Sequence, residues 1–294
     1  MKIQKLDIQI IVDNNAGPGG TLGESGFSAL AEVTYTDSTS MKLLFDTGPS
    51  PVAFLNNVKK LKIDLTLIDA IILSHGHWDH VGGLKEAIAL SKKRVPVICH
   101  PEALLPKVLI EKGKVSDIGI QGYITTNDLK NKTNLITKTT SHKLSESVLT
   151  TGKVPRQNDF ELLSGRLKKI TTVKNGTNVP DKIEDDLSLI FHLVDDTIVI
   201  LSGCCHSGIV NTTALATELT CSSKVVGIIG GLHLHDASDE RLSKTVQALK
   251  KYPIKKMAPC HCSGLRGKFA LSAPFGKQFT EVGVTTKLQF EAYS

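Results

Sequence analysis

The sequence lacks the segments that would attach the chain to a membrane or direct it out of the cell. Its apolar runs are all shorter than the roughly 20 residues that a transmembrane helix needs. The first ten residues alternate between apolar and polar side chains, as a β-strand does, without the continuous apolar segment of a signal peptide. We therefore expect a cytoplasmic protein that has no membrane partner.

The sequence also has little that would indicate a disulfide-linked or nucleic-acid-binding protein. Disulfide frameworks are rare in cytosolic chains, so the six cysteines are not expected to pair. The net charge of +6 over 294 residues is modest. Basic pairs such as Lys59-Lys60 and Lys255-Lys256 are spread out, without interleaved aromatic residues. These observations disfavour a nucleic-acid surface and leave a mild preference for anionic small molecules.

Strand-like and helix-like segments alternate along the chain, which is typical of α/β proteins. We predict a single domain over residues 1–294. The pattern indicates one helix from His80 through Lys92, and a β-hairpin whose strands span 187–194 and 197–201. The segment 103–180 is less periodic and richer in polar residues, so we interpret it as an insertion or a lid.

One short stretch carries the densest chemistry in the chain. In the run from Leu73 to Gly83, four residues with metal-binding side chains follow an apolar strand: His75, His77, Asp79 and His80. Because His75 and His77 are two apart, extended backbone projects both imidazoles to one side, where they can share an ion. Asp79 and His80 follow at the turn into a helix and can face a second ion. Imidazole and carboxylate ligands suit zinc, iron or manganese.

More distant residues would have to complete the two ligand shells. His206 follows the apolar strand at 197–201, and His261 follows the apolar strand at 254–258. Functional groups of α/β proteins lie beyond the carboxyl ends of such strands, so we predict both histidines as metal ligands. Asp46 also follows a strand, and we expect its carboxylate to orient a ligating imidazole rather than to bind metal itself.

Several other residues leave two interpretations open. His233 and His235 end a strand and either line the substrate pocket or lie at the surface. Cys204 and Cys205 provide either a bridging thiolate or a pair of small buried residues. Asp185 or Asp186 is a candidate carboxylate ligand. Three isolated histidines are interpreted as packing or solvated residues: His100, His142 and His192.

Together these residues resemble the metallo-β-lactamase superfamily. The resemblance rests on Phe45-Asp-Thr-Gly48, on the His-x-His-x-Asp-His motif at 75–80, and on the strand-end histidines His206 and His261. It implies an αββα sandwich, with two mixed β-sheets flanked by helices and a binuclear metal site between the sheets at one edge. Asp79 would serve as a proton acceptor, as the corresponding carboxylate is suspected to do in this superfamily.

A narrower resemblance is carried by further short motifs. Thr151-Gly-Lys-Val-Pro-Arg156, Ser202-Gly-Cys-Cys-His-Ser-Gly208 and Pro259-Cys-His-Cys-Ser-Gly264 are similar to a clade labelled 7,8-dihydropterin-6-methyl-4-(β-D-ribofuranosyl)aminobenzene-5′-phosphate synthase-like. The chain departs from most of the superfamily in two places. Cys204 stands where a metal-bridging aspartate is usual, and His206 would replace a ligand that usually precedes the hairpin.

The expected function is that of a metal-dependent hydrolase that uses a metal-bound hydroxide. One divalent ion, most simply zinc, would be held by His75, His77 and His206, and a second by Asp79, His80 and His261. The substrate would be a small ester or related compound that bears a phosphate or a carboxylate. Two alternatives remain. One is a non-haem iron redox enzyme of the same fold, for which the cysteines near the site would be suitable. The other is a non-catalytic metal-binding or sensor protein. The sequence does not indicate an oligomeric state.

Overall fold

Two large mixed β-sheets form the centre of the molecule. The structure is a computed structural model that describes residues 1–292. In the first sheet, β17, β1, β2 and β3 run antiparallel, and β3, β4, β5 and β8 run parallel. The strands of this sheet, in spatial order, are β17 (Lys287–Glu291), β1 (Ile3–Val12), β2 (Ser28–Tyr35), β3 (Ser40–Phe45), β4 (Ala70–Ile72), β5 (Pro96–Cys99) and β8 (Asn134–Thr137).

The second sheet combines the predicted hairpin with a parallel half. Its strands, in spatial order, are β16 (Lys256–Cys260), β15 (Val225–Gly231), β14 (Ile198–Ser202), β13 (Ser188–His192), β10 (Val148–Gly152) and β9 (Thr140–Lys143). β13 and β14 pair antiparallel with Ile190 opposite Ile200, which confirms the hairpin. β14, β15 and β16 run parallel, so their carboxyl ends meet at one edge of the sheet.

The core lies between the sheets and on both of their outer faces. In β14, Val199 and Leu201 belong to the central core, whereas Ile198 and Ile200 pack into the outer core under the C-terminal helices. This alternation follows from the two-residue period of a strand, and a strand that is apolar on both faces must be covered on both. The sequence Ile-Val-Ile-Leu is therefore suited to the centre of a layered fold.

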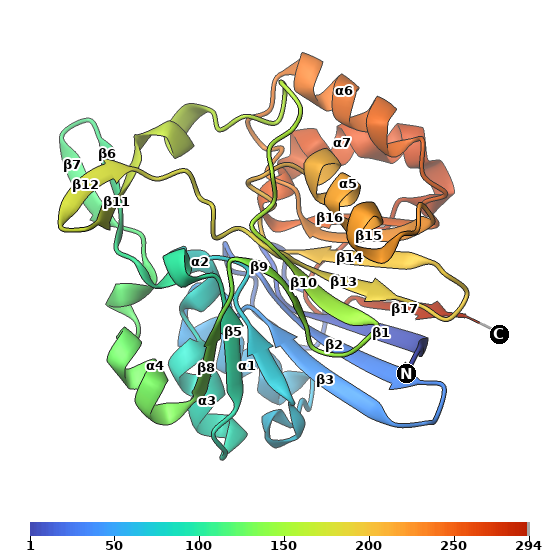
Figure 1. Ribbon diagram of the computed structural model, residues 1–294, viewed down its shortest axis with the longest axis horizontal. Helices are drawn as coiled ribbons and strands as arrows, with labels where there is room; N and C mark the ends of the chain where they lie inside the picture. Colours follow the sequence, from blue (N-terminus) through green and yellow to red (C-terminus); the bar gives the residue numbers. More distant parts are fainter. Residues whose placement is uncertain (293–294) are drawn as a thin grey trace.

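Helices cover the two outer faces, as Figure 1 shows. On the first sheet lie α1 (Pro51–Lys60), α3 (Leu84–Ser91) and α4 (Thr126–Lys132), with the short α2 (Trp78–Val81) at its edge. On the second sheet lie α5 (Ile209–Thr220), α6 (Asp239–Leu249) and α7 (Gly264–Phe275). The predicted αββα sandwich of two mixed sheets flanked by helices is therefore confirmed. None of the helices in the described range is long and apolar enough to cross a bilayer.

The prediction of a single helix from His80 through Lys92 is wrong. α2 ends at Val81, and α3 begins at Leu84. The break falls at a close contact between two segments, because a β-carbon added to Gly82 would lie 2.0 Å from the carbonyl oxygen of Pro49. Glycine permits that contact and at the same time favours helix interruption.

The segment 103–180 contributes to all three sheets of the structure. β8 extends the first large sheet, and β9 and β10 extend the second. The two ends of the segment form a separate small sheet that projects from the sandwich (Figure 1). Its strands, in spatial order, are β12 (Thr177–Pro180), β11 (Ile170–Lys174), β6 (Lys107–Glu111) and β7 (Lys114–Asp117). The role of this segment as an insertion or a lid stays a prediction.

Candidate metal centre

The site lies where loops from both large sheets meet. The motif at 75–80 directly follows β4, and His206 follows β14. His233 follows β15, and His261 follows β16. Because β14, β15 and β16 are parallel neighbours, three sequence-distant histidines emerge at the same sheet edge. The sequence therefore builds the site from strand ends, as expected.

The first donor group consists of three buried imidazoles. The potential ligand atoms of His75, His77 and His206 all lie within 4.8 Å of one another. His75 Nε2 and His206 Nε2 are 3.2 Å apart. The rings meet edge to face, with interplanar angles of 79° between His75 and His77 and 81° between His75 and His206. Their nitrogens thus converge on a common point.

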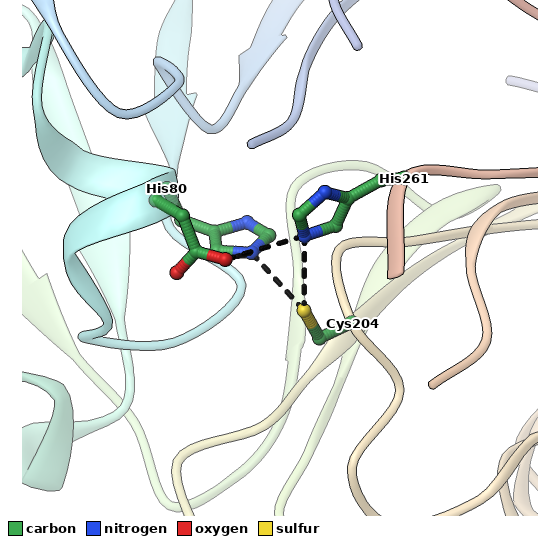
Figure 2. Close-up of side chains that lie close together, drawn as sticks. His80, Cys204 and His261 are labelled. Atoms are coloured by element: carbon green, nitrogen blue, oxygen red, sulfur yellow. Dashed lines mark hydrogen bonds and ion pairs between the residues drawn. The ribbon is translucent and has the colours of Figure 1, made fainter. Parts of the chain in front are cut away.

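The second donor group brings together Asp79, His80, Cys204 and His261, whose potential ligand atoms also lie within 4.8 Å of one another. Figure 2 shows the Cys204 thiol facing the imidazoles of His80 and His261. Cys204 Sγ lies 3.2 Å from His80 Nε2 and 3.3 Å from His261 Nε2. Asp79 Oδ2 lies 3.3 Å from His261 Nε2. Of the two interpretations left open for Cys204, the structure favours the one that places its sulfur among the donors.

Carboxylates and amides behind the two groups fix the orientation of the rings. Asp46 Oδ2 lies 2.7 Å from His80 Nδ1, and the other Asp46 oxygen accepts from the backbone N–H of Ser74 at 2.7 Å. The prediction that Asp46 orients an imidazole of the motif is confirmed by this contact. His261 is held in the same way, because its Nδ1 lies 2.9 Å from Asn14 Oδ1. Such partners leave the Nε2 atoms to face the centre.

The loops that carry these residues contain strained backbone. Asp46, Cys205, His233 and His261 all adopt positive φ angles, of 57°, 59°, 45° and 47°. Residues other than glycine rarely adopt this conformation, and it costs free energy that the surrounding structure must offset. The contacts of the surrounding loops must hold these four residues in this conformation.

The imidazoles of the two donor groups differ in pKa. Burial lowers the pKa of His75 and of His206 well below the usual value, and it lowers the pKa of His77 to about 4. These three imidazoles are therefore neutral at pH 7. Burial acts on His80 in the same direction, but the carboxylates of Asp79 and Asp46 outweigh it and raise the pKa of His80 to about 9. The second group therefore carries both a carboxylate and a protonated imidazole.

The donors fit a pair of divalent metal ions. Two nitrogen ligands of a tetrahedral zinc-sized ion lie roughly 3.4 Å apart, and a nitrogen–sulfur pair slightly more. The closest separations in the two groups are 3.2–3.6 Å. In addition, His77 Nε2 is buried and finds no hydrogen-bond partner among residues 1–292. A buried ring nitrogen without a partner costs about 1–3 kcal/mol, and a bound cation would remove that cost.

The two donor groups open into a single cavity of about 470 Å³. His77, Asp79, Cys204, His206 and His261 line its base. The small sheet, the residue after β7 and the turn that precedes β11 supply apolar lining residues and one arginine: Leu109, Ile118, Arg166, Leu167 and Ile170. The facing wall is polar and includes His233, His235 and Asp236. Of the two interpretations left open for His233 and His235, the structure therefore favours pocket-lining residues.

The remaining candidates lie outside the donor groups. Asp185 Oδ2 instead accepts from the backbone N–H of Gly76 at 2.8 Å, and Asp186 Oδ2 accepts from that of Ser207 at 3.0 Å. These two carboxylates thus hold the backbone of the ligand loops. Of the isolated histidines, His192 pairs with exposed Asp196, and His100 accepts from the backbone of Glu102.

Two important residues were not predicted as ligand or buried charge. Cys262 was noted only as one of the cysteines near the site that would suit a redox enzyme, and it lines the cavity next to Cys204 and His233. Lys107 is a fully buried lysine on β6, and its Nζ lies 2.7 Å from Asp181 Oδ2 and 2.9 Å from Asp185 Oδ1. A lysine in a polar, Lys-rich segment gives no sequence signal of burial.

Comparison with known proteins identifies the family. Residues 41–145 match the model of the Beta-lactamase superfamily domain. The chain is 31% identical over 265 residues to the uncharacterised protein MJ0448 of Methanocaldococcus jannaschii, covering 90% of this chain and 93% of the relative. The chain belongs to the metallo-β-lactamase superfamily. This confirms the resemblance that the motif at 75–80 carried.

Two further proteins resemble the chain along almost its whole length. The 7,8-dihydropterin-6-methyl-4-(β-D-ribofuranosyl)-aminobenzene-5′-phosphate synthase of Methanocaldococcus jannaschii is 27% identical over 303 residues, covering 98% of both chains. The crystal structure of Tm1679, described as a metal-dependent hydrolase of the β-lactamase superfamily, superposes with a TM-score of 0.80 at 26% identity. That match covers 98% of this chain and 100% of Tm1679. The narrower resemblance to the synthase-like clade is therefore also confirmed.

Proposed function

We propose that the protein is a binuclear metal-dependent hydrolase. His75, His77 and His206 would hold one divalent ion, and the group of Asp79, His80, Cys204 and His261 would hold the other. The observation that carries the proposal is the convergence of two separate donor groups on one cavity. Imidazole, carboxylate and thiolate donors in near-tetrahedral spacing favour zinc, and iron or manganese would suit the imidazole and carboxylate positions.

Bound divalent ions at these positions would lower the pKa of a coordinated water and polarise the bond to be cleaved. The protein's own contribution is positioning and proton transfer. Asp79 would act as the proton acceptor, because its carboxylate lines the cavity. Burial acts to raise the pKa of Asp79, but the imidazoles of His80 and His261 outweigh it and hold that pKa below the usual value, so the carboxylate is ionised. Asp46 keeps the His80 ring fixed through Nδ1, so that Nε2 faces the centre. The apolar lining residues would exclude water from the substrate side.

The substrate is proposed to be a small ester, or a related compound, that bears a phosphate or a carboxylate. The cavity volume of about 470 Å³ suits a metabolite rather than a polymer. Arg166 and His235 line this cavity and would attract an anionic group. In agreement with this, the synthase to which the chain is similar is named for a 5′-phosphate compound. We expect the protein to act in the cytoplasm on a free small molecule.

The test is metal quantification followed by a hydrolysis screen on protein purified without chelator. We expect at least two equivalents of divalent metal per chain and turnover on at least one member of a panel of phosphoesters, carboxylic esters and lactones. His75→Ala and Asp79→Ala should lose metal and turnover together. His142→Ala is the matched control, because this half-buried histidine belongs to β9, outside both donor groups. Turnover that survives in the first two variants would show that the assignment is wrong.

The same experiment distinguishes the rival functions. A redox enzyme of this fold would contain iron, and its turnover would depend on oxygen or another oxidant. A metal-binding or sensor protein would hold metal without turnover on any substrate class in the panel. The observation that favours the redox function is the thiol of Cys262, which lines the same cavity as the thiol of Cys204.

A further inference from the structure

A third set of metal-binding side chains lies beside the two donor groups. The sulfurs of Cys204 and Cys262 and a ring nitrogen of His233 all lie within 4.8 Å of one another. All three side chains line the cavity. Cys204 belongs to the proposed hydrolase site, but Cys262 and His233 have no role in it.

Three neighbouring strand ends build this set. Cys204, His233 and Cys262 follow β14, β15 and β16. The backbone N–H of His233 lies 3.3 Å from Cys262 Sγ, and Cys262 Sγ lies 3.5 Å from the carbonyl oxygen of Cys204. Gly231 permits a close approach here, because a β-carbon at that position would lie 2.2 Å from the carbonyl oxygen of Gly203 and 2.7 Å from Cys262 Sγ. The Cys262 thiol is therefore packed tightly between the three loops.

His233 supplies the second, independent sign of a ligand. Its side chain is buried, with 8% of the residue exposed, and its Nδ1 finds no hydrogen-bond partner in the part of the chain that the structure describes. The residue also adopts a positive φ of 45°. A buried ring nitrogen without a partner costs free energy, and the imidazole that carries it lies within ligand distance of both thiols.

We propose that Cys204, His233 and Cys262 form a third metal site, next to the binuclear pair. Two thiolates and an imidazole select a soft or borderline ion of the zinc or copper(I) class. Cys204 would bridge this ion and the ion of the second donor group, since its sulfur already lies against His80 and His261. The fourth position of the ion would face the cavity. The site would exist whether or not the protein is a hydrolase.

Cobalt(II) is the probe for this site, because cobalt–thiolate bonds give a charge-transfer absorption that reports sulfur ligation. Chelator-stripped full-length protein is titrated with cobalt(II), and bound metal is counted after dialysis. Wild-type protein should bind about three equivalents and Cys262→Ser about two, with the thiolate absorption reduced to the contribution of Cys204. Cys221→Ser is the matched control and should behave as wild type, because Cys221 is exposed and lies at the far end of α5, about 18 Å along the helix.

The result that overturns the proposal is a Cys262→Ser protein with the same metal count and the same thiolate absorption as wild type. If that variant does not fold, His233→Asn decides, because it keeps both thiols and should still lose the third equivalent. A His233→Asn protein that binds as much metal as wild type would also overturn the proposal. Failure of the proposed hydrolase has a different signature, since it would leave the cobalt count and absorption intact and remove only turnover.

Discussion

We predict that the buried ion pairs of Lys107 make the largest single electrostatic contribution to the stability of the fold outside the metal centre. Only 1% of its side chain is exposed, and both of its partners, Asp181 and Asp185, are fully buried. Burial alone would lower the pKa of Lys107, but the two carboxylates outweigh it and raise that pKa. This buried ionic cluster also contacts the loop that carries the metal-binding motif, because Asp185 Oδ2 accepts a hydrogen bond from the backbone N–H of Gly76.

Lys107→Met would leave two buried carboxylates without a counter-charge. Removing one partner of a buried ion pair costs about 3–5 kcal/mol, because the remaining charge stays desolvated. We therefore expect the free energy of unfolding of the metal-stripped protein to fall by about that amount at pH 7. Replacing all three residues together, with Asp181→Asn and Asp185→Asn added, should recover most of the loss, since no buried charge then remains unpaired.

Urea denaturation followed by circular dichroism measures the effect. The midpoint should shift while the slope stays the same, which would show that stability rather than compactness has changed. Lys114→Met on the adjacent strand β7 is the control, because this exposed lysine should change stability by less than about 0.5 kcal/mol. If Lys107→Met unfolds within about 1 kcal/mol of wild type, the reasoning about this buried triad is refuted.

Three further predictions concern pH, ring orientation and loop packing. In chelator-stripped protein, the raised pKa of His80 stabilises the fold fully below about pH 6.5, and this contribution of roughly 3 kcal/mol is lost as the pH rises through about 9. Urea midpoints measured across that range test this, and a His80→Gln protein with the same pH profile as wild type would contradict it. Asp46→Asn should weaken metal binding ten- to a hundred-fold in a competition titration, because the His80 ring loses its charged partner; unchanged affinity would argue against that role. Gly82→Ala should cost about 1–3 kcal/mol in thermal or urea unfolding, because its β-carbon would collide with Pro49. Gly122→Ala is the control, because its added β-carbon would meet only Asp117 Oδ2, at 3.9 Å, and equal stability of the two variants would show that the contact at Gly82 is unimportant.

The α/β class was accessible from the sequence because local periodicity carries it, whereas the αββα sandwich was implied by the resemblance to the metallo-β-lactamase superfamily. Strands that are apolar on both faces, such as β14, indicate a layered core even when the order of the strands is unknown. The helix break at Gly82 was not accessible in this way, because it depends on contact with Pro49, 33 positions earlier in the chain. The contact with Pro49 and the low helix propensity of Gly82 and Gly83 together decide where α2 ends.

The candidate site could be predicted to the extent that its residues stand at strand ends or in one compact motif. His206 and His261 were accessible because each follows an apolar strand. Cys262 was not, because its proximity to Cys204 follows from the neighbouring positions of β14, β15 and β16 in the sheet. Lys107 was not accessible either, because pairing with two carboxylates from a different strand connection is what allows its burial.

Metal counting on two single variants tests the central claim most directly. Chelator-stripped wild type, His206→Ala and His261→Ala are dialysed against zinc, and bound zinc per chain is measured by mass spectrometry. If imidazoles from distant loops share ions with the motif at 75–80, each variant should bind about one equivalent less than wild type or bind it far more weakly. Wild-type protein that binds no zinc, or variants that bind as much and as tightly as wild type, would contradict the account.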